Sequence, residues 1–316
     1  MNTVTSLLNP QRSYWLPSRS AHDPGGWRHL CDAAKIADET EIDRIVVSDH
    51  VVFGENLEAY GDPKLGGSAG GRQPTGPDGH WLDPLTVLTY VAGFATSVRL
   101  GTAILIAALR RPAVLGERTG HPDVLSGGRV DLGVGVGWQR EEYEVAGLDF
   151  EGRGRLLDHT LEVCQTLWRQ EQASFEDDLL QFDAIHQMPK PLQSGGVPIW
   201  VSGTLNRNVV RRLSAYGSGW IPWGPAAENL KSSIPQMKQA MTDAGRPDAD
   251  ALQVVGFLPL TYDGSSLHLE ATIEATKPLI DAGVTGFRVS VRFTGSYETD
   301  KATVLDIVTW FAKAFR

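Results

Sequence analysis

The sequence contains little cysteine, which excludes two classes of protein. Only Cys31 and Cys164 occur among its 316 residues, and they lie far apart. A disulfide framework requires more cysteines, and a redox or metal-binding pair requires close spacing such as C-x-x-C. Both cysteines fall within apolar helical patterns, so we expect two buried, unreactive thiols.

Long apolar stretches and a basic N-terminal segment are also missing. Nowhere do about 18 consecutive apolar residues occur, so the sequence predicts no membrane-spanning helix. Residues 1–10 have neither the basic start nor the apolar stretch of a signal peptide. We therefore expect a cytoplasmic protein that does not bind a membrane.

Positive charge is scarce. The chain has 29 Lys and Arg against 38 Asp and Glu, a net charge of −9. Because nucleic-acid binding depends on clustered Lys and Arg, nucleic acid is not an expected partner.

Local motifs for metal or nucleophilic chemistry are absent. There is no H-E-x-x-H and no Walker lysine loop, and the histidines are scattered without close ligand spacing. No metal is therefore predicted, although ligands from distant strands could still form a site. Gly66–Gly70 matches the G-x-S-x-G pattern, but no predicted strand precedes it, so we do not interpret it as a nucleophile elbow.

Runs rich in apolar and β-branched residues alternate with helical patterns. The predicted strands are Thr3–Leu8, Arg44–Ser48, Val98–Leu105, Val130–Val136, Pro198–Ser202, Ser218–Trp223, Leu252–Leu260 and Gly286–Val291. Near-continuous apolar runs are typical of parallel strands covered on both faces. The alternation predicts an α/β fold, a (β/α)8 TIM barrel with long loop insertions at its C-terminal face. No linker divides the chain, so we expect one domain over residues 1–316.

The helical patterns repeat every 3.6 residues, and two long segments interrupt them. Two apolar stripes are clear: Leu157, Leu161, Cys164 and Trp168 in one helix, and Val304, Ile307, Val308, Phe311 and Phe315 in the last. The interruptions, Gly54–His80 and Glu171–Gly196, are rich in residues that favour irregular backbone. The first is expected to be a long loop after the second strand, either a lid or binding segment or a disordered one.

Three glycines at period two, Gly133, Gly135 and Gly137, face one side of a predicted strand and are followed by Trp138. Something must approach that backbone closely. Either a tight barrel interior or a flat ligand at the strand end explains them. The spacing does not fit the G-x-G-x-x-G dinucleotide fingerprint, so a Rossmann fold is not predicted.

Polar residues follow two of the predicted strands, where barrel chemistry is usually located. Asp49 and His50 follow the second strand, and His50 is a candidate for proton transfer, while a turn cap is the alternative. Ser202, Gly203 and Thr204 follow the fifth strand, before a helical pattern. A helix N-terminus there suits a phosphate, and an ordinary Ser or Thr N-cap explains the same residues.

Several of these stretches together resemble the luciferase-like monooxygenase superfamily, especially its coenzyme F-420-dependent oxidoreductases. The matching stretches are Leu125–Arg129 with Leu132–Trp138 and Arg140–Glu142, then Val197–Gly203, Tyr216–Trp220, Ser48–His50 and Gly79–Pro84. The likeness runs from about Ser48 to Trp223. It is specific because the order, the spacing and the strand context all agree.

The resemblance implies a deazaflavin or FMN ring across the carboxyl ends of the strands. The cofactor-binding residues it implies are Asp49, His50, Ala103, Ile104, Gly135, Val136, Gly137, Trp138, Ser202, Gly203 and Thr204. Relatives carry a bulge with a non-proline cis peptide in the third strand, which by position falls on Ala103–Ile104. Trp81 and Trp138 are expected as apolar walls of the substrate pocket. The resemblance also implies a homodimer.

The sequence departs from the family in two places. Glucose-6-phosphate dehydrogenases of the family carry a glutamate where this chain has Trp138, so another substrate is expected. The stretch Arg118–Pro122 replaces a more regular helix, because Gly and Pro disfavour a helix interior. We therefore expect irregular packing of the third outer helix.

Three functional hypotheses follow. The first is an F-420-dependent oxidoreductase that transfers a hydride between the deazaflavin and a small organic substrate, with His50 as the catalytic residue. The second is an FMN-dependent monooxygenase that takes reduced flavin from a separate reductase and uses molecular oxygen. The third is a barrel that binds a cofactor without catalysis, which the fold alone cannot exclude.

Overall fold

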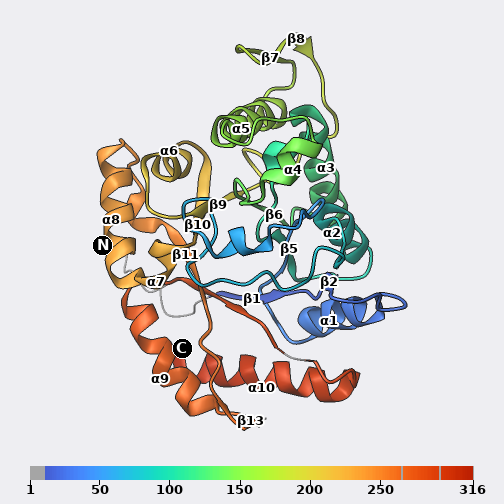
Figure 1. Cartoon of the computed structure of the whole chain (residues 1–316), viewed down its shortest axis with the longest axis vertical. Helices are drawn as coiled ribbons and strands as arrows, with labels where there is room; N and C mark the ends of the chain where they lie inside the picture. Colours follow the sequence, from blue (N-terminus) through green and yellow to red (C-terminus); the bar gives the residue numbers. More distant parts are fainter. Residues whose placement is uncertain (1–10, 265, 292, 316) are drawn as a thin grey trace.

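The barrel is the central element of the structure. The structure, a computed structural model, describes residues 11–264, 266–291 and 293–315. Within these residues eight parallel strands close in the order β1-β14-β11-β10-β9-β6-β5-β3. Their bounds are β1 Gln11–Trp15, β3 Arg44–Val47, β5 Arg99–Thr102, β6 Val130–Val134, β9 Ile199–Gly203, β10 Gly217–Pro222, β11 Gln253–Phe257 and β14 Gly286–Val289. The predicted TIM barrel is confirmed (Figure 1).

The predicted first strand does not coincide with the first strand of the barrel. The run Thr3–Leu8 lies outside the described residues, and the barrel takes β1 from the more polar Gln11–Trp15 instead. Arg12 of this strand binds Asp43 through Nε at 2.9 Å, which satisfies its charge beside the sheet. Because β1 is not a continuous apolar run, the pattern used for the other strands misses it.

Helices form the outer layer of the barrel. Their bounds are α1 Arg28–Glu39, α2 Pro84–Ala92, α3 Pro112–Leu125, α4 Arg140–Val145, α5 Arg153–Arg169, α6 Arg207–Tyr216, α7 Pro225–Glu228, α8 Leu230–Asp243, α9 Leu269–Asp281 and α10 Tyr297–Phe315, with 3-10 turns at Leu57–Gly61 (η1), Ala107–Leu109 (η2) and Ala249–Ala251 (η3). Both predicted apolar stripes are confirmed. The stripe residues of α5 and α10 are buried, and only Phe315 among them is partly exposed. Among the described helices, none is long and apolar enough to cross a membrane.

The third outer helix forms despite the departure from the family at Arg118–Pro122. Helix α3 runs without interruption through Gly120 and Pro122. Its glycines lie against α5: the indole Nε1 of Trp168 donates to the carbonyl of Gly116 at 3.0 Å. Close packing of α3 on α5 therefore outweighs the poor helix propensity of these residues.

The two cysteines differ in exposure. Cys164 is fully buried, and burial raises the pKa of its thiol to about 12. Cys31 is half-buried, with its Sγ 3.7 Å from the hydroxyl of Tyr90. The prediction of a buried thiol is thus confirmed for Cys164 and wrong for Cys31.

The two irregular segments contain short strands. Residues 171–196 include the hairpin β7 Ala173–Glu176 and β8 Gln181–Ile185, which projects away from the barrel at the top of Figure 1. The Gly54–His80 segment includes η1 and leads into β4 His80–Trp81, which pairs antiparallel with β2 Arg19–Ser20. A further pair, β12 Tyr262–Asp263 and β13 Ser266–Leu267, precedes α9. The β2–β4 pair ties the end of the long loop to the chain that follows β1.

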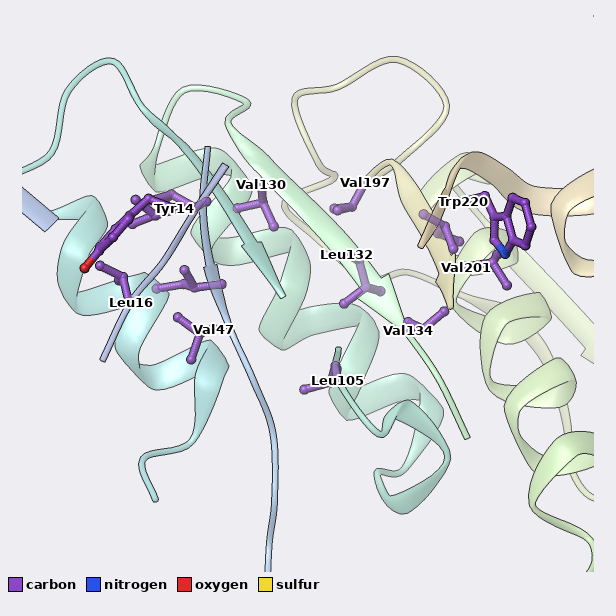
Figure 2. Packing of buried hydrophobic residues seen from close by; sticks show 14 of the residues in the cluster. Tyr14, Leu16, Val47, Leu105, Val130, Leu132, Val134, Val197, Val201 and Trp220 are labelled. Carbon is purple, nitrogen blue, oxygen red and sulfur yellow. The ribbon is translucent and has the colours of Figure 1, made fainter. Parts of the chain in front are cut away.

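The core joins the strands to the helices around them. Figure 2 shows Leu132 and Val134 of β6 beside other members of the same cluster, among them Leu105 and Val201. All four side chains are fully buried. Such interdigitated apolar packing makes the strands a rigid support for the loops at their carboxyl ends.

A buried charge cluster lies toward the amino ends of the strands. The carboxylate of Asp131 accepts from Arg44 Nε at 2.7 Å and from Arg99 Nε and Nη2 at 2.7 Å each. The Asp131 side chain is only 4% exposed. Loss of its charge would leave the buried Arg44 guanidinium without a counter-ion, which is far more costly than the loss of a surface pair.

We expect the substitution Asp131→Asn to lower the free energy of unfolding by about 3 kcal/mol or more. Urea denaturation followed by circular dichroism measures the loss. The control is Asp178→Asn, because Asp178 pairs with Arg155 at the surface, with both side chains more than half exposed. Its loss should be below about 1 kcal/mol. Equal losses in the two variants would contradict a stabilising role for the buried cluster.

Candidate functional site

A cavity of about 460 Å³ opens at the carboxyl ends of the barrel strands. All the residues predicted for the site lie in its wall: Asp49, His50, Trp81, Ala103, Ile104, Gly135, Val136, Gly137, Trp138, Ser202, Gly203 and Thr204. Residues of the loop after β3 line it too, among them Tyr60 and Gln73. The Gly54–His80 segment therefore forms part of the cavity wall.

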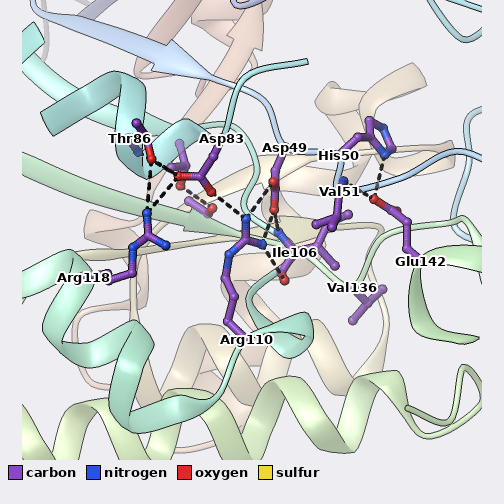
Figure 3. A network of polar contacts seen from close by, with 12 residues as sticks. Asp49, His50, Val51, Asp83, Thr86, Ile106, Arg110, Arg118, Val136 and Glu142 are labelled. Atoms are coloured by element: carbon purple, nitrogen blue, oxygen red, sulfur yellow. Dashed lines mark hydrogen bonds and ion pairs between the residues drawn. The ribbon is translucent and has the colours of Figure 1, made fainter. Parts of the chain in front are cut away.

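Asp49 is bound to other groups of the protein. Its carboxylate receives the Arg110 guanidinium at 2.5 and 2.9 Å and the backbone N–H of Ile106 at 2.9 Å (Figure 3). Its side chain is 1% exposed. Although burial opposes the charge, Asp49 and Asp83 raise the pKa of Arg110 above its ordinary value. Asp49 thus positions the segment after β5, and its charge is already neutralised by Arg110.

Strand β5 is interrupted at the predicted position. The peptide bond between Ala103 and Ile104 is cis, as the resemblance implies. Pairing with β6 resumes beyond it, where Leu105 N–H donates to the carbonyl of Gly133 at 2.8 Å. Ala103 and Ile104 both line the cavity.

The neighbouring chain explains the period-two glycines. A Cβ on Gly133 would lie 2.0 Å from the Thr102 carbonyl oxygen, and one on Gly135 would lie 3.0 Å from the Ile104 side chain. Gly137 has φ +69° and faces Ile106 at 3.2 Å. The tight-interior explanation is therefore correct for Gly133, whereas Gly135 and Gly137 also line the cavity.

His50 is fixed by one carboxylate and several aromatic rings. Its Nδ1 lies 3.2 Å from Glu142 Oε1, which also accepts the backbone N–H of Val51 at 2.8 Å. The imidazole packs on Phe53 at 4.6 Å and edge-on to Trp81 at 4.8 Å between ring centroids. With a proton on Nδ1 donated to Glu142, Nε2 is left to accept or donate a proton. Glu142 belongs to a stretch that resembles the family, but the sequence analysis did not assign it this role.

The turn after β9 differs in part from the prediction. Helix α6 starts at Arg207, and its N-cap is Asn206, whose side chain accepts from the N–H groups of Asn208 and Val209 at 3.0 Å each. The Ser or Thr N-cap considered from the sequence is therefore wrong. Ser202, Gly203 and Thr204 lie before the cap, in the cavity wall.

An arginine that the sequence did not suggest, Arg153, also lies in the cavity wall. Arg153 stacks on Phe150 at 3.8 Å and donates to the carbonyls of Phe150 and Leu65. Its Nε is buried and has no partner among the described residues. Burial lowers the pKa of Arg153, and no carboxylate of the described residues pairs with it. Such a cation in the wall suits a phosphate.

Several further residues of the wall were missed, among them Arg19, Tyr60 and Arg288. A signal existed for Arg288, because it is the charged residue within the apolar run Gly286–Val291. For Arg19 and Tyr60 nothing in the local sequence indicates a cavity. Arg19 lies in the two-residue strand β2 and Tyr60 in the short 3-10 turn η1, and the positions of both segments depend on long-range packing.

The wall fits a flat ring that carries a phosphate arm. Glycine and small residues form one side, and the indole N–H of Trp138 is buried without a partner in the described part of the chain. A cavity of this size is typical of small-molecule sites. No cluster of three or more His, Cys, Asp or Glu able to hold a metal occurs in the described residues.

Comparison with known proteins agrees with this geometry. The family model described as luciferase-like monooxygenase matches residues 11–296. The F-420-dependent glucose-6-phosphate dehydrogenase of Mycobacterium leprae is 28% identical over 210 residues, which cover 64% of this chain and 61% of that protein.

Two solved structures share the fold. A monooxygenase from Streptomyces bottropensis has a TM-score of 0.74 at 16% identity, covering 97% of this chain and all of that one. An F-420-dependent secondary alcohol dehydrogenase, solved with an F-420-acetone adduct, has a TM-score of 0.71 at 17% identity, covering 98% of this chain and 99% of the other.

The close approach at Gly137 yields a prediction. We expect Gly137→Ala to lose about 1–3 kcal/mol more stability than Gly147→Ala. The two glycines have nearly the same φ, +69° and +70°, but a Cβ on Gly147 would meet nothing within 4 Å. The difference between the variants, measured by urea denaturation, therefore reports crowding against Ile106 alone. Equal losses of stability in the two variants would mean that the Ile106 side chain moves aside at no cost.

Proposed function

Because the chain belongs to the luciferase-like monooxygenase family, we propose that it is an oxidoreductase in which coenzyme F-420 exchanges a hydride with a small organic substrate. The observation that carries the proposal is the cavity wall in which Ala103 and Ile104 lie beside Gly135–Trp138, with His50 in the same wall. The relative from Mycobacterium leprae, whose name states its dependence on F-420, favours the deazaflavin.

In this proposal the protein positions the cofactor and excludes water. Ala103, Ile104 and Gly135–Trp138 contact the ring, while Asp49 and Arg110 hold the segment after β5 in place. Ser202–Thr204 and Arg153 bind the phosphate. The deazaflavin supplies the carbon that accepts or donates the hydride.

His50 manages the proton. When a hydride leaves an alcohol carbon, the hydroxyl proton must leave as well, and in the reverse direction a carbonyl oxygen must gain one. Glu142 orients the imidazole so that Nε2 can take or give this proton. Trp81 and Trp138 provide apolar walls that keep the substrate against the ring.

The likeness to a monooxygenase supports a second candidate, an FMN-dependent monooxygenase. The same wall would hold FMN, with reduced flavin supplied by a separate reductase and molecular oxygen as co-substrate. A homodimer and a small-molecule substrate are expected for both candidates. The choice between them therefore depends on the cofactor that binds.

Parallel titrations with F-420 and FMN test the proposal. We expect F-420 to quench the tryptophan fluorescence and, at about 100 times its dissociation constant, to stabilise the fold by about 2.7 kcal/mol, seen as a higher Tm. Binding of FMN alone would instead support the monooxygenase. If neither cofactor binds, both candidates fail.

The proposed contact between Arg153 and the cofactor phosphate can be tested with a matched control variant. Arg153→Met should weaken F-420 binding about tenfold or more, since a charge-assisted contact is lost. Arg155→Met removes the same charge from a surface pair with Asp178 and should leave the affinity unchanged. An unchanged affinity in Arg153→Met would contradict this phosphate contact.

His50→Ala should reduce kcat by about 10²–10⁴-fold with a reactive substrate, because general acid–base catalysis contributes that much. F-420 affinity should change less than about threefold, since the ring contacts remain. The control is His80→Ala, because His80 is exposed and is not part of the cavity wall. Wild-type kcat in His50→Ala would exclude the proton-transfer role.

A further inference from the structure

One side of the cavity, above β1 and β14, holds two guanidinium groups against the same indole. The Arg288 guanidinium lies 5.5 Å from the Trp15 ring centroid, and that of Arg19 lies 5.0 Å from it. All three residues line the cavity. We call this group the Arg19–Arg288 corner.

Arg288 is a buried cation without a counter-ion in the described residues. It is 4% exposed, and its Nε and Nη2 have no hydrogen-bond partner there. Its guanidinium lies over the aromatic rings of Trp15 and Phe257, with its central carbon 4.3 Å from the Phe257 ring centroid. The positions outside the described residues, 1–10, 265, 292 and 316, include no Asp or Glu. Burial lowers the pKa of Arg288 to about 10, so the group is still charged at neutral pH.

Arg19 is in a similar position. Its Nη1 donates to the Ser48 hydroxyl at 3.1 Å, and its guanidinium also lies over the Trp81 ring at 5.3 Å. No carboxylate pairs with it in the part of the chain described. Burial lowers the pKa of Arg19, while the nearby Tyr60 partly offsets this.

The remaining polar groups of the corner add donors. The indole N–H of Trp15 is buried without a partner in the described residues, and an indole can only donate. Burial raises the pKa of the Tyr60 phenol, with Arg19 and Arg288 opposing it, so the neutral hydroxyl is the form present at neutral pH. The chain carries a net charge of −9, yet this corner presents cations and donors. A buried charge without a partner is costly, which points to a ligand that pairs with it.

The arrangement of donors selects one kind of anion. Nε and Nη2 form one edge of a guanidinium, and this chain repeatedly binds a carboxylate with that edge. Arg99 holds Asp131 through Nε and Nη2 at 2.7 Å each, and Arg12 holds Asp43 by the same two atoms at 2.9 and 3.4 Å. The Arg288 guanidinium makes no hydrogen bond to the described residues, and its Nε and Nη2 are both buried without a partner. A planar carboxylate matches that edge.

We propose that the Arg19–Arg288 corner binds a carboxylate group of the substrate, so that the substrate is an organic acid with an apolar or aromatic body. The inference rests on the proposed function, in which the substrate lies in this cavity. The closed strand order separates the corner from the phosphate arm, because β9 lies four strands from β1 in either direction. The rings of Tyr60, Trp81 and Trp138 lie in the wall as well and suit the apolar body.

Benzoate and benzamide are matched probes, since they differ in charge and little in shape. In the absence of cofactor, tryptophan fluorescence and calorimetric titration should give an affinity for benzoate at least about tenfold higher than for benzamide. In Arg288→Met this preference should fall below about threefold, and in Arg19→Met it should be reduced. Arg155→Met, which removes a surface charge, should keep the full preference. Equal affinities for the two probes in the wild-type protein would overturn the proposal.

Stability separates a ligand-binding role of Arg288 from a structural one. Replacing an uncompensated buried charge with Met should keep or raise the Tm without ligand, whereas loss of a structural contact would lower it. A lowered Tm together with an unchanged benzoate preference in Arg288→Met would show that Arg288 only supports the fold.

Titration of benzoate in saturating F-420 or FMN shows whether the substrate or the cofactor binds at the Arg19–Arg288 corner. Retained benzoate binding supports the substrate, while competition with the cofactor would assign the corner to the cofactor and overturn the proposal. The failure of this proposal can be distinguished from the failure of the proposed function. If neither cofactor binds but benzoate is still preferred, the redox function fails and the carboxylate site stands; if a cofactor binds without a benzoate preference, the reverse holds.

Discussion

The ion pair between Asp49 and Arg110 determines the shape of the cavity. Asp49 follows β3, Arg110 follows the η2 turn, and the same carboxylate binds the backbone N–H of Ile106, so three points of the chain meet at one buried charge. Arg110 reaches further to Asp83, which caps α2 by accepting from the N–H of Thr86. These bonds hold the segment after β5 and the start of α2 in one arrangement.

The barrel could be predicted from the sequence because most of its strands are continuous apolar runs, and the family resemblance placed the wall from Asp49 to Thr204 correctly around one cavity. β1 was missed since its polar side chains find partners only in the folded chain. Helix propensity alone does not account for α3 either, because Gly116 lies close to Trp168 of α5 in a contact that propensity does not include. Tyr60 and Arg19 reach the wall through loop geometry that no local pattern encodes.

Charge is distributed very differently inside the cavity and over the whole chain. The chain as a whole has an acidic excess, yet the cavity wall includes the cations Arg19, Arg153 and Arg288, which have no ion pair with a carboxylate among the described residues. Low dielectric surroundings strengthen such charges toward a bound anion. Two separate cationic points fit two ligands in one cavity, a cofactor phosphate and a second anion, better than they fit one.

The β2–β4 ribbon has a consequence for how this protein can change. It pairs Arg19 directly with Trp81, so one short ribbon carries both a charged and an aromatic side chain of the wall, outside the barrel hydrogen bonds. Substitutions in the ribbon alter what the cavity accepts without disturbing the closed sheet, and the buried core tolerates them because it does not depend on them. Selectivity can therefore diversify here while the architecture beneath stays constant, a separation that makes the ribbon the natural place to redesign substrate choice.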